Sequence, residues 1–81
     1  MKVTVRLFAA ARVAANAETL ELEIPEDSSI SELRSTLVDQ LPQLKELAST
    51  LRFAINEDYA TDTDLVQAGD DIACIPPVSG G

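Results

Sequence analysis

The segment of this 81-residue chain that suggests a chemical role is its last six residues, Pro76-Pro77-Val78-Ser79-Gly80-Gly81. Two consecutive prolines cannot donate hydrogen bonds to a strand ladder, so we expect the chain to leave its sheet there as an extended tail. The final two residues have no side chain. The tail could therefore enter a narrow channel, with the Gly81 carboxylate at its tip.

A carboxylate at such a tip becomes an acyl donor only after a leaving group has been attached. Adenylation by ATP would supply that group, and a glycine carbonyl presents the least steric hindrance to the nucleophile that follows. Taken alone, Gly80-Gly81 is also what a frayed chain end looks like. The preceding Pro-Pro pair and the order of the predicted elements favour the functional interpretation.

The amino-acid composition argues against catalytic and metal sites elsewhere in the chain. The chain has no histidine and one cysteine, which excludes imidazole general-base chemistry and zinc sites that use several of these residues. Cys74 lies in an apolar segment, so we expect a packed and unreactive thiol. Asp62, Asp64, Asp70 and Asp71 lack the spacing of a calcium loop, so no metal site is expected.

Charge and hydropathy limit the partners. Six basic and 14 acidic residues give a formal net charge of −8, which argues against a binder of the phosphate backbone of nucleic acids. No segment approaches the ~18–20 apolar residues of a membrane span. A lone cysteine suits a reducing compartment. We expect a cytoplasmic protein with no nucleic-acid and no membrane partner.

Two strands are predicted near the start of the chain. Apolar and polar residues alternate over residues 2–7 and again over residues 19–24, as in strands with one buried face. Pairing them would set Lys2 and Arg6 on the same face as Glu21 and Glu23. The Ala-rich segment between the strands, residues 9–18, is too long for a tight hairpin.

A main helix and a short helix are predicted next. Ser29 and Glu32 have the spacing of a capping box, and apolar residues follow at helical intervals. Pro42 would clash with a continuing helix, so the first helix should end near Gln40. Pro42 then suits the first turn of a second, short helix.

The remaining segments predict the centre of a sheet. Phe53 and Ile55 begin a strand that turns at residues 56–58, and the unbroken apolar run 72–75 is typical of a strand buried on both faces. For that last strand to be central it must lie parallel to the first one. The prediction is an α+β fold of the β-grasp type. One mixed sheet clasps one main helix plus a short helix, in a single domain of residues 1–81 with a flexible tail, 76–81.

The whole chain resembles the MoaD family, the small, sulfur-carrying, ubiquitin-like subunits of molybdopterin synthase. The tail is similar to the family's Pro-Pro-Val-x-Gly-Gly ending. Two departures are visible, because Cys74 and Ile75 stand where aromatic residues often precede the prolines, and residues 13–16 replace a Glu-x-x-Gly segment. The other matching positions are Lys2-Val3, Leu7-Phe8-Ala9, Arg12, Ala54-Ile55-Asn56, Leu65, Gly69-Asp70 and Ile72-Ala73.

The resemblance implies a mechanism and a set of partners. An E1-like adenylating enzyme would activate Gly81 with ATP and magnesium, and a sulfur donor protein would convert it to a thiocarboxylate. The tail would then enter the active site of the large subunit, in a heterotetramer of two small and two large subunits. There it would give sulfur to a cyclic pterin monophosphate in two rounds, forming the dithiolene of molybdopterin. The chain itself would bind no cofactor, and the catalytic groups would belong to the large subunit.

Two apolar residues near the tail are predicted to dock the partner. Phe8 is out of step with the inward Val3, Val5 and Leu7, so we expect it to face outward near the sheet edge. Ile75 lies directly before the prolines. The alternative for Phe8 is a position capping the end of the core.

Three other functions fit parts of the sequence. The chain could carry sulfur for thiazole synthesis or tRNA thiolation, or it could be a ubiquitin-like modifier that forms isopeptide bonds. It could also be a plain binding module with an incidental Gly-Gly end.

Overall fold

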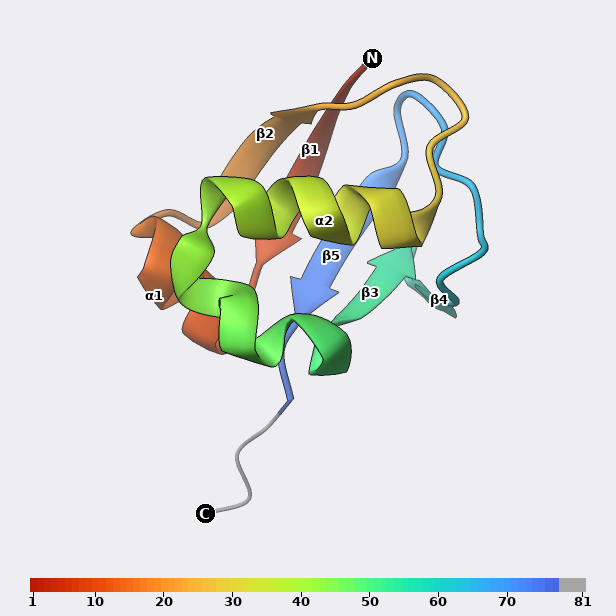
Figure 1. The fold of residues 1–81 in the computed structure, drawn as a ribbon. Coiled ribbons are helices and arrows are strands. Elements are labelled where there is room, and N and C mark those ends of the chain that lie inside the picture. Colours follow the sequence, from red (N-terminus) through yellow and green to blue (C-terminus); the bar gives the residue numbers. More distant parts are fainter. Residues whose placement is uncertain (78–81) are drawn as a thin grey trace.

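The structure, a computed structural model, describes residues 1–77. Its strands form one five-stranded sheet in the order β2-β1-β5-β3-β4 (Figure 1). The strands are β1 (Lys2–Leu7), β2 (Thr19–Glu23), β3 (Arg52–Ile55), β4 (Asp58–Ala60) and β5 (Asp71–Ile75). The helices are α1 (Ala9–Ala15), α2 (Ile30–Gln40) and the 3-10 helix η1 (Pro42–Thr50).

The first and last strands pair in parallel at the middle of the sheet, with Val5 opposite Ile72. The other neighbours, β1 with β2, β3 with β5 and β3 with β4, are antiparallel. The prediction of a central, parallel last strand is confirmed. Its cause is the unbroken apolar run of β5, whose middle residues, Ile72, Ala73 and Cys74, are all buried.

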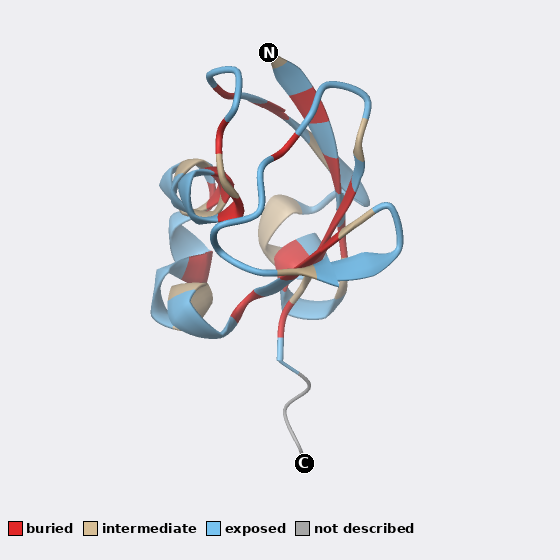
Figure 2. Cartoon of the chain, turned by 90° about the vertical axis from the view of Figure 1, so that its right-hand side faces the viewer, coloured by how far each residue is buried: buried red, intermediate tan, exposed pale blue. Residues whose placement is uncertain are grey.

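The main helix α2 crosses one face of the sheet (Figure 1), and the core fills the space between them. Val5, Leu7 and Phe53 face it from the strands, and Leu33 and Leu37 face it from α2. Figure 2 places the buried segments on the inner sides of the strands and helices. This is the predicted clasp of a mixed sheet around one helix.

Local signals set the bounds of α2 and η1. The Ser29 side chain accepts a hydrogen bond from the Glu32 backbone N–H at 3.2 Å, and the Glu32 carboxylate accepts one from the Ser29 N–H at 3.1 Å. The predicted capping box is therefore formed. Helix α2 ends at Gln40 as predicted, and Pro42 opens η1.

Helix α1 is an element that the sequence pattern did not predict. Its inward face consists of alanines, with Ala11 fully buried and Ala14 and Ala15 packed against the core. Alanine side chains give a weak hydrophobic period, so the segment reads only as an Ala-rich connection. Asn16 ends the helix in the left-handed conformation, at φ 53°.

No helix within residues 1–77 is long and apolar enough to cross a membrane.

Candidate functional site

The chain leaves the folded body at the end of β5, next to the prolines. Pro76 is buried and Pro77 is exposed, as Figure 2 illustrates. Strand β5 ends at Ile75, so the chain leaves the sheet at the prolines as predicted, and the bounds of the tail, 76–81, stay a prediction.

The other tail residues predicted to act in the partner's active site lie outside the described residues. They are Val78, Ser79, Gly80 and Gly81. Their proposed roles stay predictions.

Phe8 and Ile75 are brought together on the outer face of the sheet, away from α2. The Phe8 backbone N–H donates to the Cys74 carbonyl at 3.3 Å, so the β1–β5 register continues past Leu7 and sets Phe8 beside Ile75. Both side chains are half-buried. Phe8 thus faces outward, and it directly follows β1, which lies between the edge strand β2 and the central strand β5.

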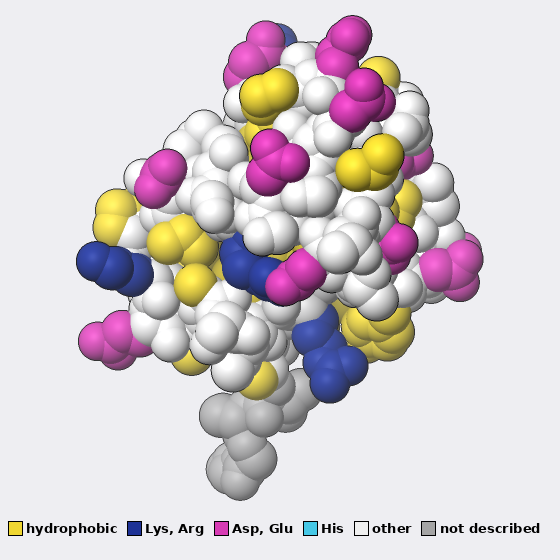
Figure 3. Space-filling view, turned by 45° about the vertical axis from the view of Figure 1, so that its right-hand side comes forward, with side chains coloured by type: hydrophobic (Ala, Val, Ile, Leu, Met, Phe, Trp, Pro, Cys, Tyr) yellow, Lys and Arg dark blue, Asp and Glu magenta, His cyan; other side chains and the backbone are white. Residues whose placement is uncertain are grey.

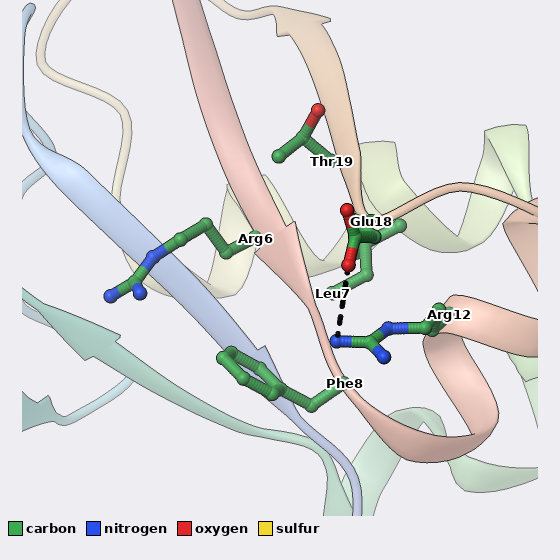
Figure 4. A pocket seen from close by; sticks show the side chains of 6 residues that line it. All are labelled: Arg6, Leu7, Phe8, Arg12, Glu18 and Thr19. Atoms are coloured by element: carbon green, nitrogen blue, oxygen red, sulfur yellow. Dashed lines mark ion pairs between the residues drawn. The ribbon is translucent and has the colours of Figure 1, made fainter.

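A shallow cavity of about 270 Å³ adjoins Phe8 (Figure 4). In this view the Phe8 ring lies between the side chains of Arg6 and Arg12. The cavity is lined by Arg6, Leu7, Phe8, Arg12, Glu18 and Thr19.

Arginine side chains lie next to both predicted docking residues, Phe8 and Ile75. The sequence interpretation did not single out these arginines. The Arg6 guanidinium lies 5.9 Å from the centroid of the Phe8 ring, and Arg52 is paired directly with Ile75 across the β3–β5 ladder. The available signal was the alternation of β1, which puts Arg6 on the same face as Phe8. The placement of Arg52 required knowing that β3 pairs with β5.

Cys74 points the other way, into the core. It is fully buried, and burial raises the pKa of its thiol from 9.0 to about 11, with the Arg34 charge offsetting part of the rise. A neutral thiol in apolar surroundings is a poor nucleophile. The expected packed thiol is confirmed.

Residues 1–77 contain no group of three or more His, Cys, Asp or Glu side chains that could hold a metal ion. The arrangement can dock a partner beside the exit of the tail, through Phe8 and Ile75.

Comparison with known proteins agrees with this geometry. Residues 5–81 match the model of the ThiS family. The chain is 40% identical over 81 residues to the molybdopterin synthase sulfur carrier subunit of Arabidopsis thaliana, covering 100% of this chain and 84% of that one. It is 30% identical over 83 residues to the Chlamydomonas reinhardtii protein of the same name, with 100% of both chains covered.

Solved structures give the same fold. Small archaeal modifier protein 1 of Haloferax volcanii superposes with a TM-score of 0.85 at 25% identity over 100% of both chains. A putative molybdopterin converting factor subunit 1 of Pyrococcus furiosus gives 0.84 at 26% identity, covering 96% of this chain and 99% of that one.

A third structure contains a complex. It is the complex of subunits 1 and 2 of the molybdopterin-converting factor of Helicobacter pylori, with a TM-score of 0.67 at 27% identity over 100% of both chains. Fold, tail motif and full-length similarity thus agree, and the chain belongs to the ThiS family, among the molybdopterin synthase sulfur carrier subunits.

Proposed function

We propose that this chain is the sulfur carrier subunit of a molybdopterin synthase. The observation that carries the proposal is its similarity, over its whole length, to the Arabidopsis protein of that name. The Pro76-Pro77-Val78-Ser79-Gly80-Gly81 ending supports it, because a carrier needs a slender segment with an unhindered acyl carbon.

The proposed reaction uses the Gly81 carboxylate. An E1-like enzyme adenylates it with ATP and magnesium, which forms an acyl–AMP mixed anhydride and releases pyrophosphate. A sulfur donor protein then delivers sulfide-level sulfur to the same carbon, AMP departs, and a thiocarboxylate remains. The large subunit takes this sulfur for the cyclic pterin monophosphate, and two rounds make the dithiolene. The lone, buried Cys74 suits a reducing compartment, so the reaction is proposed for the cytoplasm.

The body of the chain serves as a rigid holder for the tail. Pro77 follows a strand that is hydrogen-bonded on both sides, by β1 and by β3. A segment that leaves a central strand is held more firmly than one that leaves an edge or a loop. The large subunit is proposed to dock on Phe8 and Ile75 and to receive residues 77–81, in a heterotetramer of two small and two large subunits. The complex of subunits 1 and 2 from Helicobacter pylori supports such pairing.

The other functions considered from the sequence are weaker. Carriers for thiazole synthesis or tRNA thiolation would use the same chemistry, but the curated relatives with high similarity carry the molybdopterin synthase name. A protein modifier is suggested by the fold it shares with the Haloferax protein, at lower sequence identity.

Intact mass spectrometry tests the proposal. The chain is incubated with its activating enzyme, ATP, magnesium and a sulfur donor, and a matched sample omits ATP. We expect the complete mixture to gain the oxygen-to-sulfur mass difference at Gly81, and the sample without ATP to stay unchanged.

Two outcomes would argue against it. Unmodified protein, with an enzyme and donor proven active on another carrier, would refute the thiocarboxylate. Attachment of the chain to larger proteins through Gly81 would favour the modifier.

A further inference from the structure

Three arginines surround the place where Pro77 leaves the body, and we call Arg6, Arg12 and Arg52 the arginine surface. Arg6 and Arg12 line the cavity beside Phe8, and Arg52 is paired with Ile75 on the other side. The predicted docking residues therefore lie between cationic side chains. This is unexpected in a chain whose formal net charge is −8.

The three guanidinium groups differ in how far the chain itself neutralises them. Arg6 forms two hydrogen bonds with the Asp71 carboxylate, at 2.9 and 3.0 Å. Arg12 has a long contact of 3.9 Å with Glu18, whose side chain is largely exposed. Arg52 has no ion pair with any residue in the described range 1–77. Arg12 and Arg52 thus keep most of their charge available to another molecule.

Aromatic contacts limit the freedom of two of these arginines. The Arg52 guanidinium lies 5.9 Å from the centroid of the exposed Tyr59 ring, as Arg6 does from Phe8. A guanidinium held over a ring loses less conformational entropy when it pairs with a carboxylate. The surface is suited to bind a planar anionic group.

The acidic residues concentrate at the opposite end of the sheet. That end holds the start of β1 and β5, the turn between β3 and β4, and the loop after β2 (Figure 1). In Figure 3, most acidic side chains of the visible face lie in its upper part, whereas a basic side chain adjoins a hydrophobic one near the lower end. The acidic residues at the end of the sheet opposite the arginine surface include Glu23, Glu26, Asp27, Glu57, Asp58 and Asp70.

We propose that Arg12 and Arg52 bind carboxylates of the large subunit at the rim of the opening that receives the tail. This inference rests on the proposed function. It adds that the rim of the large subunit is acidic, which the proposed function by itself does not specify. The interior of that opening must hold a phosphorylated substrate, but its rim meets the cationic end of the carrier. An acidic rim is repelled by the net negative charge of the rest of the chain and attracted at the arginine surface, so it favours the tail-first orientation.

Charge reversal tests the proposal, with binding to the purified large subunit measured by titration calorimetry at low and at moderate salt. The variants are Arg12→Glu and Arg52→Glu. The matched control is Lys2→Glu, which makes the same change in net charge at the far end of β1, where Lys2 is exposed. We expect Kd to rise about tenfold for either arginine variant and less than about twofold for Lys2→Glu. Added salt should weaken the wild type more than the arginine variants.

Three outcomes of this experiment would overturn the proposal. Equal effects of Arg12→Glu, Arg52→Glu and Lys2→Glu would overturn the arginine surface alone, because only net charge would matter. Tighter binding after reversal would mean that the rim is basic, and would also overturn it. Arg12→Gln and Arg52→Gln answer the same question if a glutamate variant fails to fold. A wild-type chain that does not bind the large subunit would overturn this inference together with the proposed function, whereas the mass test of Gly81 addresses that function separately.

Discussion

Burial decides the chemistry of the only thiol. Cys74 lies opposite Phe53 on β3 and is fully enclosed by the core, so ionising it would put a charge in apolar surroundings. Its pKa therefore rises to about 11. A raised pKa in the folded state means that the unfolded chain loses its proton first as the pH increases. The resulting stabilisation is complete below about pH 9 and is lost as the pH rises through 11.

Removing the thiol should show this pH dependence. We expect the free energy of unfolding of the wild type, minus that of Cys74→Ala, to be constant from pH 7 to 8.5 and to fall by on the order of 2 kcal/mol by pH 11. Urea unfolding at several pH values measures it, and other titrating groups cancel because both chains share them. A difference that stays constant to pH 11 would mean that the buried thiol ionises as easily as a free one.

Single-residue roles could be predicted where they depend on the residue's own neighbours in sequence. The packed state of Cys74 followed from its apolar run. Arg6 is different: the sequence placed it on the same face as Glu21 and Glu23 of the second strand, but its ion pair is with Asp71 of β5. The Arg6–Asp71 contact joins neighbouring parallel strands, and nothing local in the sequence specifies it. The burial of Pro76 likewise depends on residues distant in sequence, and these leave no mark in a Pro-Pro pair.

Helix α2 depends on its first turn. Two reciprocal hydrogen bonds between Ser29 and Glu32 satisfy backbone N–H groups that the helix cannot satisfy itself. The helix forms one wall of the core, so its cap contributes to the stability of the whole domain.

Loss of the cap should destabilise the protein measurably. Ser29→Ala is expected to lower the free energy of unfolding by about 1 kcal/mol. Ser35→Ala serves as the control, because Ser35 is exposed within α2 and alanine favours helix there. Urea unfolding at neutral pH compares the two. Equal stability of both variants would show that the first turn is held by packing alone.

Elements with strong apolar patterns were predicted and the weak ones were not. Strands β1, β2, β3 and β5, and helices α2 and η1, carry large apolar side chains whose positions indicate the buried faces. Strand β4, with the sequence Asp-Tyr-Ala, has no such pattern and was expected only as the segment after a turn. Helix α1 buries only alanines, so its existence depends on the shallow space that the sheet and η1 leave for it. Such a space is known only once the whole fold is known.

At the scale of the whole molecule, tail length should control sulfur transfer. The body sets where the tail begins, so one residue more or less after Gly80 moves the reactive carbon by roughly 3.3 Å, about the attack distance of ~3–3.5 Å. We expect both a Gly81 deletion and a one-residue extension to bind the large subunit with little change in Kd, yet to transfer no sulfur.

A length-preserving change is the control for that experiment. Ser79→Gly alters the tail without moving its end and should still support product formation in a reconstituted synthase assay. Near-normal product from either length variant would exclude the tip of the tail as the reactive group.

The parallel pairing of the first and last strands also has a consequence for how the chain folds. Arg6 and Asp71, which join β1 to β5, are 65 positions apart in the sequence. Contacts this distant are slow to form, because a long loop must close before they contribute any stability. Because β5 lies between β1 and β3, these two strands cannot be joined into one sheet until β5 has been synthesised. The segment that follows β5 is presented on a rigid body only by chains that have finished folding, so a partner that needs both the surface and the tail selects finished molecules.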